Sequence, residues 1–437
     1  MPDNSISQRI CDFALNFSGD EVPDTARHVM QLSLLDWVAV TVAGQDEPVT
    51  EILREMVADE GGAEQAYVLG LTRAVPARAA ALANGTAGHA LDYDDTHFLC
   101  LAHPSAAVVP AAMAIADLKS ASPRAFQEAA LIGVETACRV GAWLGPEHYR
   151  IGLHMTASAG AFGAAAAAGR LLGLTADQMR NAIGLVASLA SGVKAQFGTM
   201  GKPFHAGHAA ASGVEAALLA ARGMVAAADG LDGPQGFGAT HHGTANISAL
   251  DGFGEAFVFE SVQHKFHACC HGTHATLDAL SLLKEGQKIA PADVAKITIR
   301  IAPGFLRVCD IIEPSTGLEA KFSYRMVTAL SLLGYDTARL DTFNDALCTD
   351  PAVLALRDRV QAVGDDTVSE TAAKVQIDLQ DGTSISAQSD LSALTDIDAR
   401  TARLRAKADS LLGQERAADI WGRITREEGL ASQWIRR

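Results

Sequence analysis

The sequence predicts a mainly α-helical protein with two domains, a large all-helical domain and a smaller α+β domain inserted into it. The chain has 437 residues, whereas single hydrophobic cores stop growing at roughly 250–300 residues. Apolar residues recur at helical spacing as far as about Phe259, with small residues where helices would cross. A strand-type alternation follows, and the last segment, from Asp398 to Leu430, returns to a helical pattern.

The first part of the chain is expected to be helix after helix. Val29, Leu32 and Leu35 show helical spacing, and the run from Thr175 to Gln178 is a capping-box start for a later helix. Glycine recurs over 192–210, so we expect a loop there. The expected helices cover 6–17, 24–42, 48–60, 76–91, 105–118, 123–144, 155–169, 176–190 and a segment ending near 222, with a short extended piece at 66–71.

The pattern of the smaller domain is different. The run KITIRI at 296–301 alternates and is β-branched, which predicts a strand. Asp381-Gly382 is a strong turn signal between two further strands. Those strands are expected at 374–379 and 384–388, and helices at 275–284, 320–333 and 351–363. We therefore expect an all-helical domain formed by 1–264 and 396–437, and an α+β domain over 265–395.

Composition and charge restrict the partners. A net charge of −16 argues against nucleic acid and anionic membranes, because both require a basic footprint. The most apolar run, Met155–Gly169, is shorter than the about 20 apolar residues that a membrane span needs. Seven cysteines without a CxxC pattern, and a start without a signal-peptide pattern, are typical of a reduced cytoplasmic protein. The negative net charge does not exclude a small anionic substrate, because such a substrate needs only a few cations in one cleft.

The segment Gly88–Pro110 concentrates acid–base groups between two apolar helices. Such groups can transfer protons and orient a substrate. They could also bind a metal, since carboxylates and imidazoles are usual ligands, although no HExxH pattern accompanies them. Aspartates that only cap helices and turns are the structural alternative. The candidate residues are Asp92, Asp94, Asp95, Thr96, His97 and His103.

A second basic segment, Gly198–His208, contains Lys202, His205 and His208. Glycine-rich backbone can approach an anion, and lysine is a point-charge partner for a carboxylate. Pro203 follows Lys202, so the segment is not a phosphate-binding P-loop. A surface loop with solvated basic residues is the structural alternative.

Three further positions are ambiguous on sequence alone. Lys265 and His271 lie in a histidine-rich run whose spacing fits no standard zinc site, and His154 precedes a small-residue helix. Tyr324 and Arg325 begin a helix of the smaller domain. Each could serve a site, or could instead be a cap or a surface residue.

These segments together resemble the MmgE/PrpD family, which includes 2-methylcitrate dehydratase, cis-aconitate decarboxylase and iminodisuccinate epimerase. The resemblance implies a helical domain with an inserted α+β lid, a homodimer and no organic cofactor. We assign no metal ligands among the site residues. The resemblance is carried, over roughly residues 80–330, by GHALDYDDTH with HPSAAVVPA, GLHMTASAGAFGAAAAAGRLLGL, FGTMGKPFHAGHAA, KFHACCHGTH and TGLEAKFSYRM.

The resemblance also implies which residues form the active-site cleft. The catalytic residues would be Asp92, Thr96, His103, His154, Lys202 and Lys265. The substrate-binding residues would be His97, His205, His208, His271, Tyr324 and Arg325. The sequence departs from decarboxylase-like members, which place a histidine where Cys270 stands, and from many members that have a tyrosine at the position of Met326.

The implied function is a cofactor-independent enzyme that removes a proton next to a carboxylate of a small di- or tricarboxylate. Such a proton is weakly acidic, so its removal needs a positioned base and cations. Lys202 and Lys265 would hold carboxylates, while His103 and His154 would move protons. We expect a hydro-lyase resembling 2-methylcitrate dehydratase, with an epimerase of the iminodisuccinate type as the alternative. A cis-aconitate decarboxylase-like lyase, a metal-dependent hydrolase and a non-catalytic binding protein also stay open.

Overall fold

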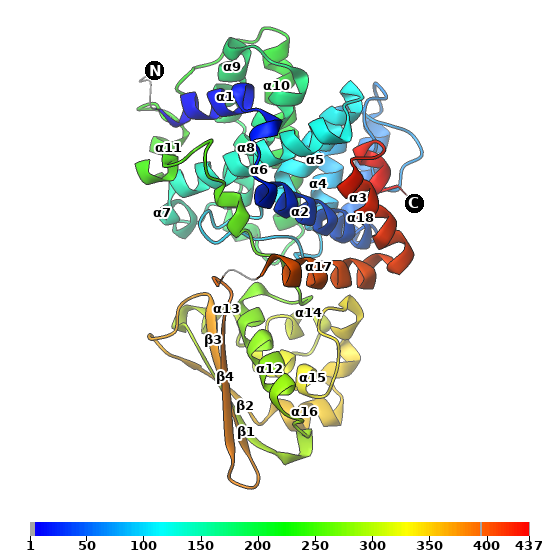
Figure 1. Cartoon of the computed structure of the whole chain (residues 1–437), viewed down its shortest axis with the longest axis vertical. Coiled ribbons are helices and arrows are strands. Elements are labelled where there is room, and N and C mark those ends of the chain that lie inside the picture. The colour runs from blue at the N-terminus through cyan, green and yellow to red at the C-terminus, as the bar shows by residue number, and fades with distance from the viewer. Residues whose placement is uncertain (1–4, 394–395, 437) are drawn as a thin grey trace. The chain divides into compact units, whose positions relative to one another are not determined.

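The chain divides into two compact units in a computed structural model that describes residues 5–393 and 396–436. One unit is formed by Met1–His264 with Leu404–Arg437, and the other by Lys265–Arg403. Figure 1 follows the chain through both units. The first unit is helical and the second contains a small sheet, which confirms the predicted fold class. The boundary predicted after residue 395 falls on 394–395, which lie outside the described residues.

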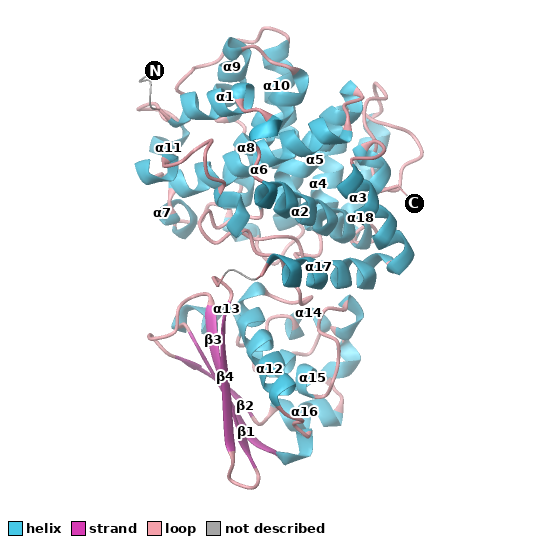
Figure 2. Cartoon of the chain, viewed as in Figure 1, coloured by secondary structure: helices cyan, strands magenta, loops and turns pink. Residues whose placement is uncertain are grey.

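The first unit consists of helices joined by loops and short 3-10 turns (Figure 2). A capping box begins α9, where Thr175 N and Gln178 Oε1 lie 3.0 Å apart and Gln178 N and Thr175 Oγ1 3.3 Å apart, as predicted. The helices are α1 (Ile6–Asn16), α2 (Asp24–Ala43), α3 (Pro48–Glu60), α4 (Ala77–His89), α5 (Pro104–Lys119), α6 (Pro123–Leu144), α7 (Pro146–Arg150), α8 (Met155–Leu172), α9 (Ala176–Val186), α10 (Gly201–Ala221), α11 (Phe237–Thr240) and α18 (Gln414–Arg426), with α17 (Ile397–Leu412) crossing the unit boundary.

Small residues let the central helices of this unit approach one another closely. Helix α8 packs against α5, α6 and α10, and its residues from Met155 to Gly169 are all buried. A Cβ atom on Gly163 would lie 2.3 Å from the carbonyl oxygen of Gly133 in α6. Backbone this close leaves no room for a side chain, because protein interiors are close-packed. The alanine-rich run is therefore a core helix, as expected.

The expected loop over 192–210 was wrong for its second half. Helix α10 begins at Gly201, so Lys202 and His205 lie on its first two turns. Gly207 lies where α10 contacts α4, and a Cβ atom there would be 2.2 Å from the carbonyl oxygen of Leu82. Glycine at this position allows two helices to touch. The sequence pattern alone did not distinguish that role from a loop.

The second unit contains a four-stranded mixed sheet in the order β2-β1-β3-β4. Strand β1 pairs in parallel with β2 and antiparallel with β3, and β3 pairs antiparallel with β4. Helices α12 and α15 lie along one face of this sheet (Figure 1). The elements are β1 (Val294–Ile301), β2 (Val360–Gly364), β3 (Ala372–Leu379), β4 (Ser384–Asp390), α12 (His274–Gly286), α13 (Leu306–Cys309), α14 (Gly317–Ala320), α15 (Tyr324–Leu332) and α16 (Pro351–Arg357).

The expected helix over 351–363 was also wrong in its second half. Helix α16 ends at Arg357, and the chain then forms β2, in which Val360 pairs with Ile297 of β1. That pairing joins residues far apart in sequence. The predicted hairpin around Asp381-Gly382 is confirmed by the β3–β4 pairing. Among the described residues, no helix combines the length and apolarity needed to cross a bilayer.

Candidate active site

The loop between α4 and α5 connects the end of one buried helix to the start of the next. His89 is the last residue of α4, and His103 is the N-cap of α5, with Pro104 at its first position. Asp92 and Leu101 adopt left-handed backbone conformations, with φ of 49° and 51°. These bends fold the loop back, so the two histidines face each other with ring centroids 4.6 Å apart.

Asp94 lies between these two imidazoles. Its carboxylate oxygens are 2.9 and 3.0 Å from His89 Nδ1, and one of them is 3.2 Å from His103 Nδ1. Burial alone would raise the pKa of Asp94, but His89 and His103 hold it well below its usual range. A carboxylate can only accept hydrogen bonds, so His89 Nδ1 carries its proton toward Asp94, and His103 Nδ1 lies at ion-pair distance from the same carboxylate. Asp94 thereby fixes the orientation of both rings through their Nδ1 atoms.

Lys202 joins this group from the first turn of α10. Its Nζ lies 2.8 Å from Asp92 Oδ2, while Asp92 Oδ1 lies 3.7 Å from His103 Nε2. The Lys202 ammonium also lies 5.3 Å from the centre of the Phe197 ring. Asp92 thus connects a cation to the second nitrogen of His103. A carboxylate on a small ligand has the same charge as Asp92 and could pair with Lys202 in its place.

His154 borders the same group at the start of α8. Its ring lies 6.1 Å from that of His89, and its Nδ1 is 3.1 Å from His205 Nδ1. Burial lowers the pKa of His154 well below its usual value, and the positive charges of His89 and Lys202 lower it further. The pKa of His205 is also lowered, mainly by burial. His154 is therefore a neutral imidazole at neutral pH and can accept a proton.

The same donor atoms could also be considered as metal ligands. One atom from each of His89, Asp92, Asp94 and His103 lies within 4.8 Å of the others. Asp94 already pairs with two imidazoles, however, and Asp92 already pairs with the Lys202 ammonium. A divalent cation would have to displace these partners and lie beside a fixed positive charge. The arrangement is better suited to proton transfer than to metal binding.

The structure brings together five of the expected site residues and places others differently. The grouped residues are Asp92, His103, His154, Lys202 and His205. Thr96 lies in the same loop, where its backbone pairs with Gln263. The neighbouring residue His97 is fully buried, with Nε2 2.8 Å from the Val258 carbonyl oxygen. His208 lies one turn beyond His205, with Nε2 3.4 Å from Ser191 Oγ.

The remaining expected residues belong to the second unit. Lys265 is its first residue and is buried. Tyr324 is buried and its hydroxyl donates a hydrogen bond to the Gly272 carbonyl oxygen at 2.8 Å, while Arg325 Nε lies 3.8 Å from Asp310. The His271 ring lies 4.8 Å from that of His274. The expected roles of these residues in substrate binding or catalysis stay predictions.

Sequence reasoning gave His89 no role, although the structure places it at the centre of the group. It is the last residue of an alanine-rich helix. The available signal was its position at the end of that helix, five residues before Asp94. Its ring is fully buried, and its Nε2 has no hydrogen-bond partner among the described residues.

Comparison with known proteins gives matches along most of the chain. Residues 8–250 match the family model of the MmgE/PrpD N-terminal domain, and residues 267–415 match that of the MmgE/PrpD C-terminal domain. The chain is 25% identical over 417 residues to a cis-aconitate decarboxylase of Aspergillus terreus, covering 87% of this chain and 84% of the relative. It is 25% identical over 413 residues to the cis-aconitate decarboxylase-like protein oryM of Aspergillus oryzae, covering 88% and 86%. Cis-aconitate decarboxylase of Mus musculus is 27% identical over 341 residues, covering 72% and 67%.

Proposed function

Because this chain belongs to the MmgE/PrpD family, we propose that it is a lyase that acts on a small di- or tricarboxylate by proton transfer at a carbon next to a carboxylate. The observation that carries the proposal is the Asp94 carboxylate, which holds the His103 imidazole beside the Asp92–Lys202 ion pair. Relatives named cis-aconitate decarboxylase support the lyase class and a small carboxylate substrate.

His154 is the proposed base. A base must be unprotonated before it can remove a proton, and the lowered pKa of His154 keeps it so at neutral pH. Lys202 would exchange Asp92 for a substrate carboxylate, and its charge would stabilise the negative charge that develops as the proton leaves. This stabilisation is larger in a site shielded from water, and the Lys202 side chain is only 16% exposed.

His103 is the proposed acid. Carboxylates face both of its nitrogens, at 3.2 Å for Asp94 and 3.7 Å for Asp92, so a proton on each nitrogen has an acceptor nearby. In a dehydration, the C–H bond gives its electron pair to a new C=C bond, the C–O bond breaks, and the hydroxyl leaves with a proton from His103 Nε2. A separate base and acid suit this reaction, so we propose a hydro-lyase resembling 2-methylcitrate dehydratase.

Decarboxylation is the second candidate, and the names of the relatives favour it. In that reaction the bond to one carboxylate breaks, carbon dioxide leaves, and the electron pair stays on carbon until His103 supplies a proton. The reaction needs an acid but no base. Epimerisation remains the third possibility and would use His103 and His154 to exchange one proton. Two departures argue against a simple transfer of the decarboxylase activity. Cys270 stands where decarboxylase-like members have a histidine, and Met326 stands where many members have a tyrosine.

Proton and carbon NMR in heavy water tests the proposal. Citrate-like, aconitate-like and aspartate-derived polycarboxylates are added in turn to the purified protein. Loss of water to an alkene supports the hydro-lyase, and carbon dioxide release with deuterium on the adjacent carbon identifies the decarboxylase. Deuterium that enters next to a carboxylate while stereoisomers interconvert, with no alkene formed, identifies the epimerase. No reaction with any of these compounds would contradict the proposed substrate class.

Four further expectations belong to the same proposal. A second carboxylate clamp at Lys265, a homodimeric assembly, independence from organic cofactors and a cytoplasmic location stay predictions. Each has its own measurement: substitution of Lys265, sedimentation, activity after extensive dialysis, and fractionation.

A further inference from the structure

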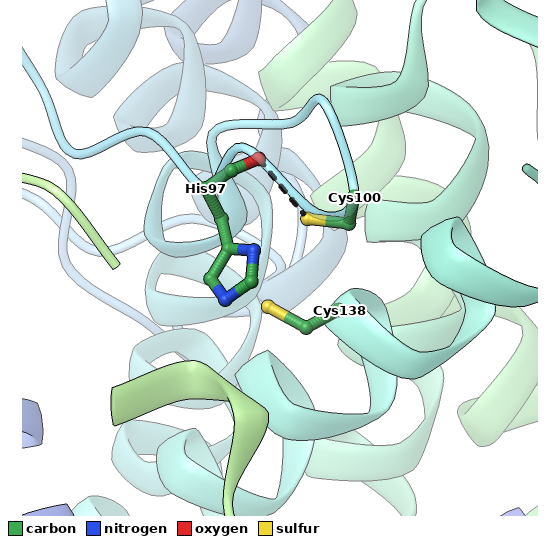
Figure 3. Close-up of side chains that lie close together, drawn as sticks. All are labelled: His97, Cys100 and Cys138. Carbon is green, nitrogen blue, oxygen red and sulfur yellow. Dashed lines mark hydrogen bonds between the residues drawn. The ribbon is translucent and has the colours of Figure 1, made fainter. Parts of the chain in front are cut away.

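A second group of chemically active side chains lies between the α4–α5 loop and helix α6. His97 and Cys100 come from the loop and Cys138 from α6, and Figure 3 shows the three side chains directed toward one another. One donor atom from each, an imidazole nitrogen or a thiol sulfur, lies within 4.8 Å of the other two. All three side chains are fully buried. The proposed proton-transfer steps use none of them.

The hydrogen bonds of His97 leave one ring nitrogen without a partner. Nε2 lies 2.8 Å from the carbonyl oxygen of Val258 and 3.1 Å from Ser261 Oγ. A carbonyl oxygen only accepts, so Nε2 carries a proton, and in the neutral ring Nδ1 is the nitrogen that offers a lone pair. Nδ1 is buried and has no hydrogen-bond partner among the described residues. A histidine that binds metal through one nitrogen usually donates its other N–H to a carbonyl or carboxylate in this way.

The loop that carries Cys100 packs closely against α6, which carries Cys138. A Cβ atom on Gly141 of α6 would lie only 2.6 Å from Cys100 Cβ, so glycine is required for the loop to approach. Cys138 precedes Gly141 by one helical turn and therefore lies on the same side of α6. Cys100 Sγ also lies 3.7 Å from the His97 carbonyl oxygen. This packing presents both sulfurs to His97.

We propose that His97 Nδ1 and the sulfurs of Cys100 and Cys138 bind a divalent zinc-type metal ion that ties the α4–α5 loop to α6. Two thiolates, one neutral imidazole and a divalent ion sum to zero charge, which a fully buried site requires because an unpaired buried charge is costly. The two thiol protons are released to solvent on binding.

The distances between the donor atoms suit this ion. Zinc lies about 2.3 Å from sulfur and about 2.0 Å from nitrogen, so one nitrogen and two sulfurs at tetrahedral angles are roughly 3.5–3.8 Å apart. The donor atoms here lie within 4.8 Å of one another, so a bound ion would draw them closer together. Three protein ligands leave a fourth position for a water molecule, as in other sites with two cysteines and one histidine.

The position of the site predicts its effect. His97 directly follows Thr96, and Cys100 precedes His103 by three residues. A metal ion that fixes His97 and Cys100 would therefore restrict the loop that carries His103. Metal removal should lower thermal stability and reduce the turnover that depends on His103, without a metal contact to the substrate.

The test uses the full-length protein, purified under reducing conditions and freed of metal. It is then loaded separately with Zn²⁺ and Co²⁺. We expect one ion per chain after gel filtration, a thiolate-to-cobalt charge-transfer band with Co²⁺, and a higher melting temperature with Zn²⁺. Cys100→Ser and Cys138→Ser should each weaken binding at least about 10-fold, the lower end of the loss seen when metal-site partners are removed. Circular dichroism checks that both variants fold.

Two matched cysteine variants control for other thiols. Cys11→Ser removes the other buried thiol of the helical unit, and Cys309→Ser removes one member of a pair in the second unit whose sulfurs lie 3.2 Å apart. Both should keep the metal. Wild-type protein that binds neither ion stoichiometrically would overturn the proposal, whether or not the variants fold. Metal binding that is lost only in Cys309→Ser would also overturn the proposal. So would protein that is isolated with a Cys100–Cys138 disulfide and binds no metal after that disulfide has been reduced.

Discussion

Lys202 Nζ lies 2.8 Å from Asp92 Oδ2, in an ion pair that joins the first turn of α10 to the loop after α4. The Asp92 side chain is 37% exposed whereas that of Lys202 is 16% exposed. The acid is therefore the more easily displaced partner, and the lysine stays in the shielded position. This geometry leads us to expect that a substrate carboxylate replaces Asp92 at Lys202.

Substitution of Lys202 tests this exchange. Lys202→Met keeps the length of the side chain and removes its charge, so we expect kcat/KM to fall by about 100-fold or more. Lys194→Met is the matched control, because Lys194 lies over the Tyr149 ring 3.6 Å from its centre and makes no ion pair with Asp92 among the described residues. Steady-state kinetics should show the loss in the first variant alone. Equal activity in both variants would remove Lys202 from the site.

Substitution of Asp94 tests the orientation of the two imidazoles. Asp94→Asn removes the negative charge that faces His89 Nδ1 and His103 Nδ1, and it replaces one carboxylate oxygen by an NH₂ group that cannot accept from either ring. We expect kcat to fall by about 100-fold or more, with a smaller change in KM. Asp95→Asn is the control, because Asp95 accepts hydrogen bonds from Ser105 instead. A fully active Asp94→Asn variant would contradict the proposed role.

The buried carboxyl of Asp95 predicts a pH-dependent stability. Burial raises its pKa to about 7, and Asp36 and Asp94 add to the effect. The folded chain therefore binds a proton that the unfolded chain has lost between pH 3.8 and about 7. The contribution of this proton to stability is complete below pH 3.8. It is lost as the pH rises toward 7, at roughly 1.4 kcal/mol for each step of one in pH.

Asp95→Asn should remove the loss of stability that accompanies the rise in pH. Urea unfolding at pH 5 and pH 8 should show the variant gaining stability relative to wild type as the pH rises. An unchanged difference at the two pH values would show that Asp95 does not titrate as proposed.

His154 predicts a second pH effect, of opposite sign. Its pKa is lowered in the folded chain by burial and nearby positive charge, so the unfolded chain binds the additional proton below the ordinary histidine value of 6.5. Stability attributable to His154 is present above that pH and is lost as the pH falls below it. His154→Asn should unfold with a shallower acid dependence than wild type. The acid limb of kcat/KM in the wild type should also lie below pH 6.5, and a limb at or above that value would contradict a neutral His154 base.

Gly207 tests the packing that carries Lys202 and His205. A Cβ atom there would lie 2.2 Å from the Leu82 carbonyl oxygen, so Gly207→Ala should lower the free energy of unfolding by about 1–3 kcal/mol or more. At Gly286 a Cβ atom would have no neighbouring heavy atom within 4 Å among the described residues. Gly286→Ala should therefore be neutral or slightly stabilising in the same urea titration. Similar stabilities for the two variants would contradict the close contact of α10 with α4.

Much of the fold could be predicted because it depends on local signals. The helical spacing of apolar residues predicted α2 and α6. The capping box at Thr175 predicted the start of α9, and the Asp381-Gly382 turn predicted the β3–β4 hairpin. The start of α10 could not be located, since a glycine that permits helix contact and a glycine that permits a turn look alike in sequence. Strand β2 was missed because its partner β1 lies about 60 residues earlier, and a short apolar run does not show its own period.

Candidate site residues could be predicted from the sequence where they lie close together in the chain or match family motifs. The α4–α5 loop with Asp92 and His103 was identified in this way, and so were Lys202 and His154. The pairing of His89 with Asp94 depends on a left-handed bend at Asp92, which residue types alone do not specify. Cys138 joins His97 only through the packing of α6 on the loop.

Turnover in heavy water by His103→Gln tests the central claim most directly. Wild type, His103→Gln and His28→Gln are compared on the same polycarboxylate by NMR, where His28 is a control histidine on α2 whose ring lies 5.9 Å from that of Trp421. We expect the wild type and His28→Gln to convert the substrate at similar rates, and His103→Gln to be at least about 100-fold slower. A folded His103→Gln variant that turns over at the wild-type rate would show that His103, held by Asp94, is not the proton donor of this site.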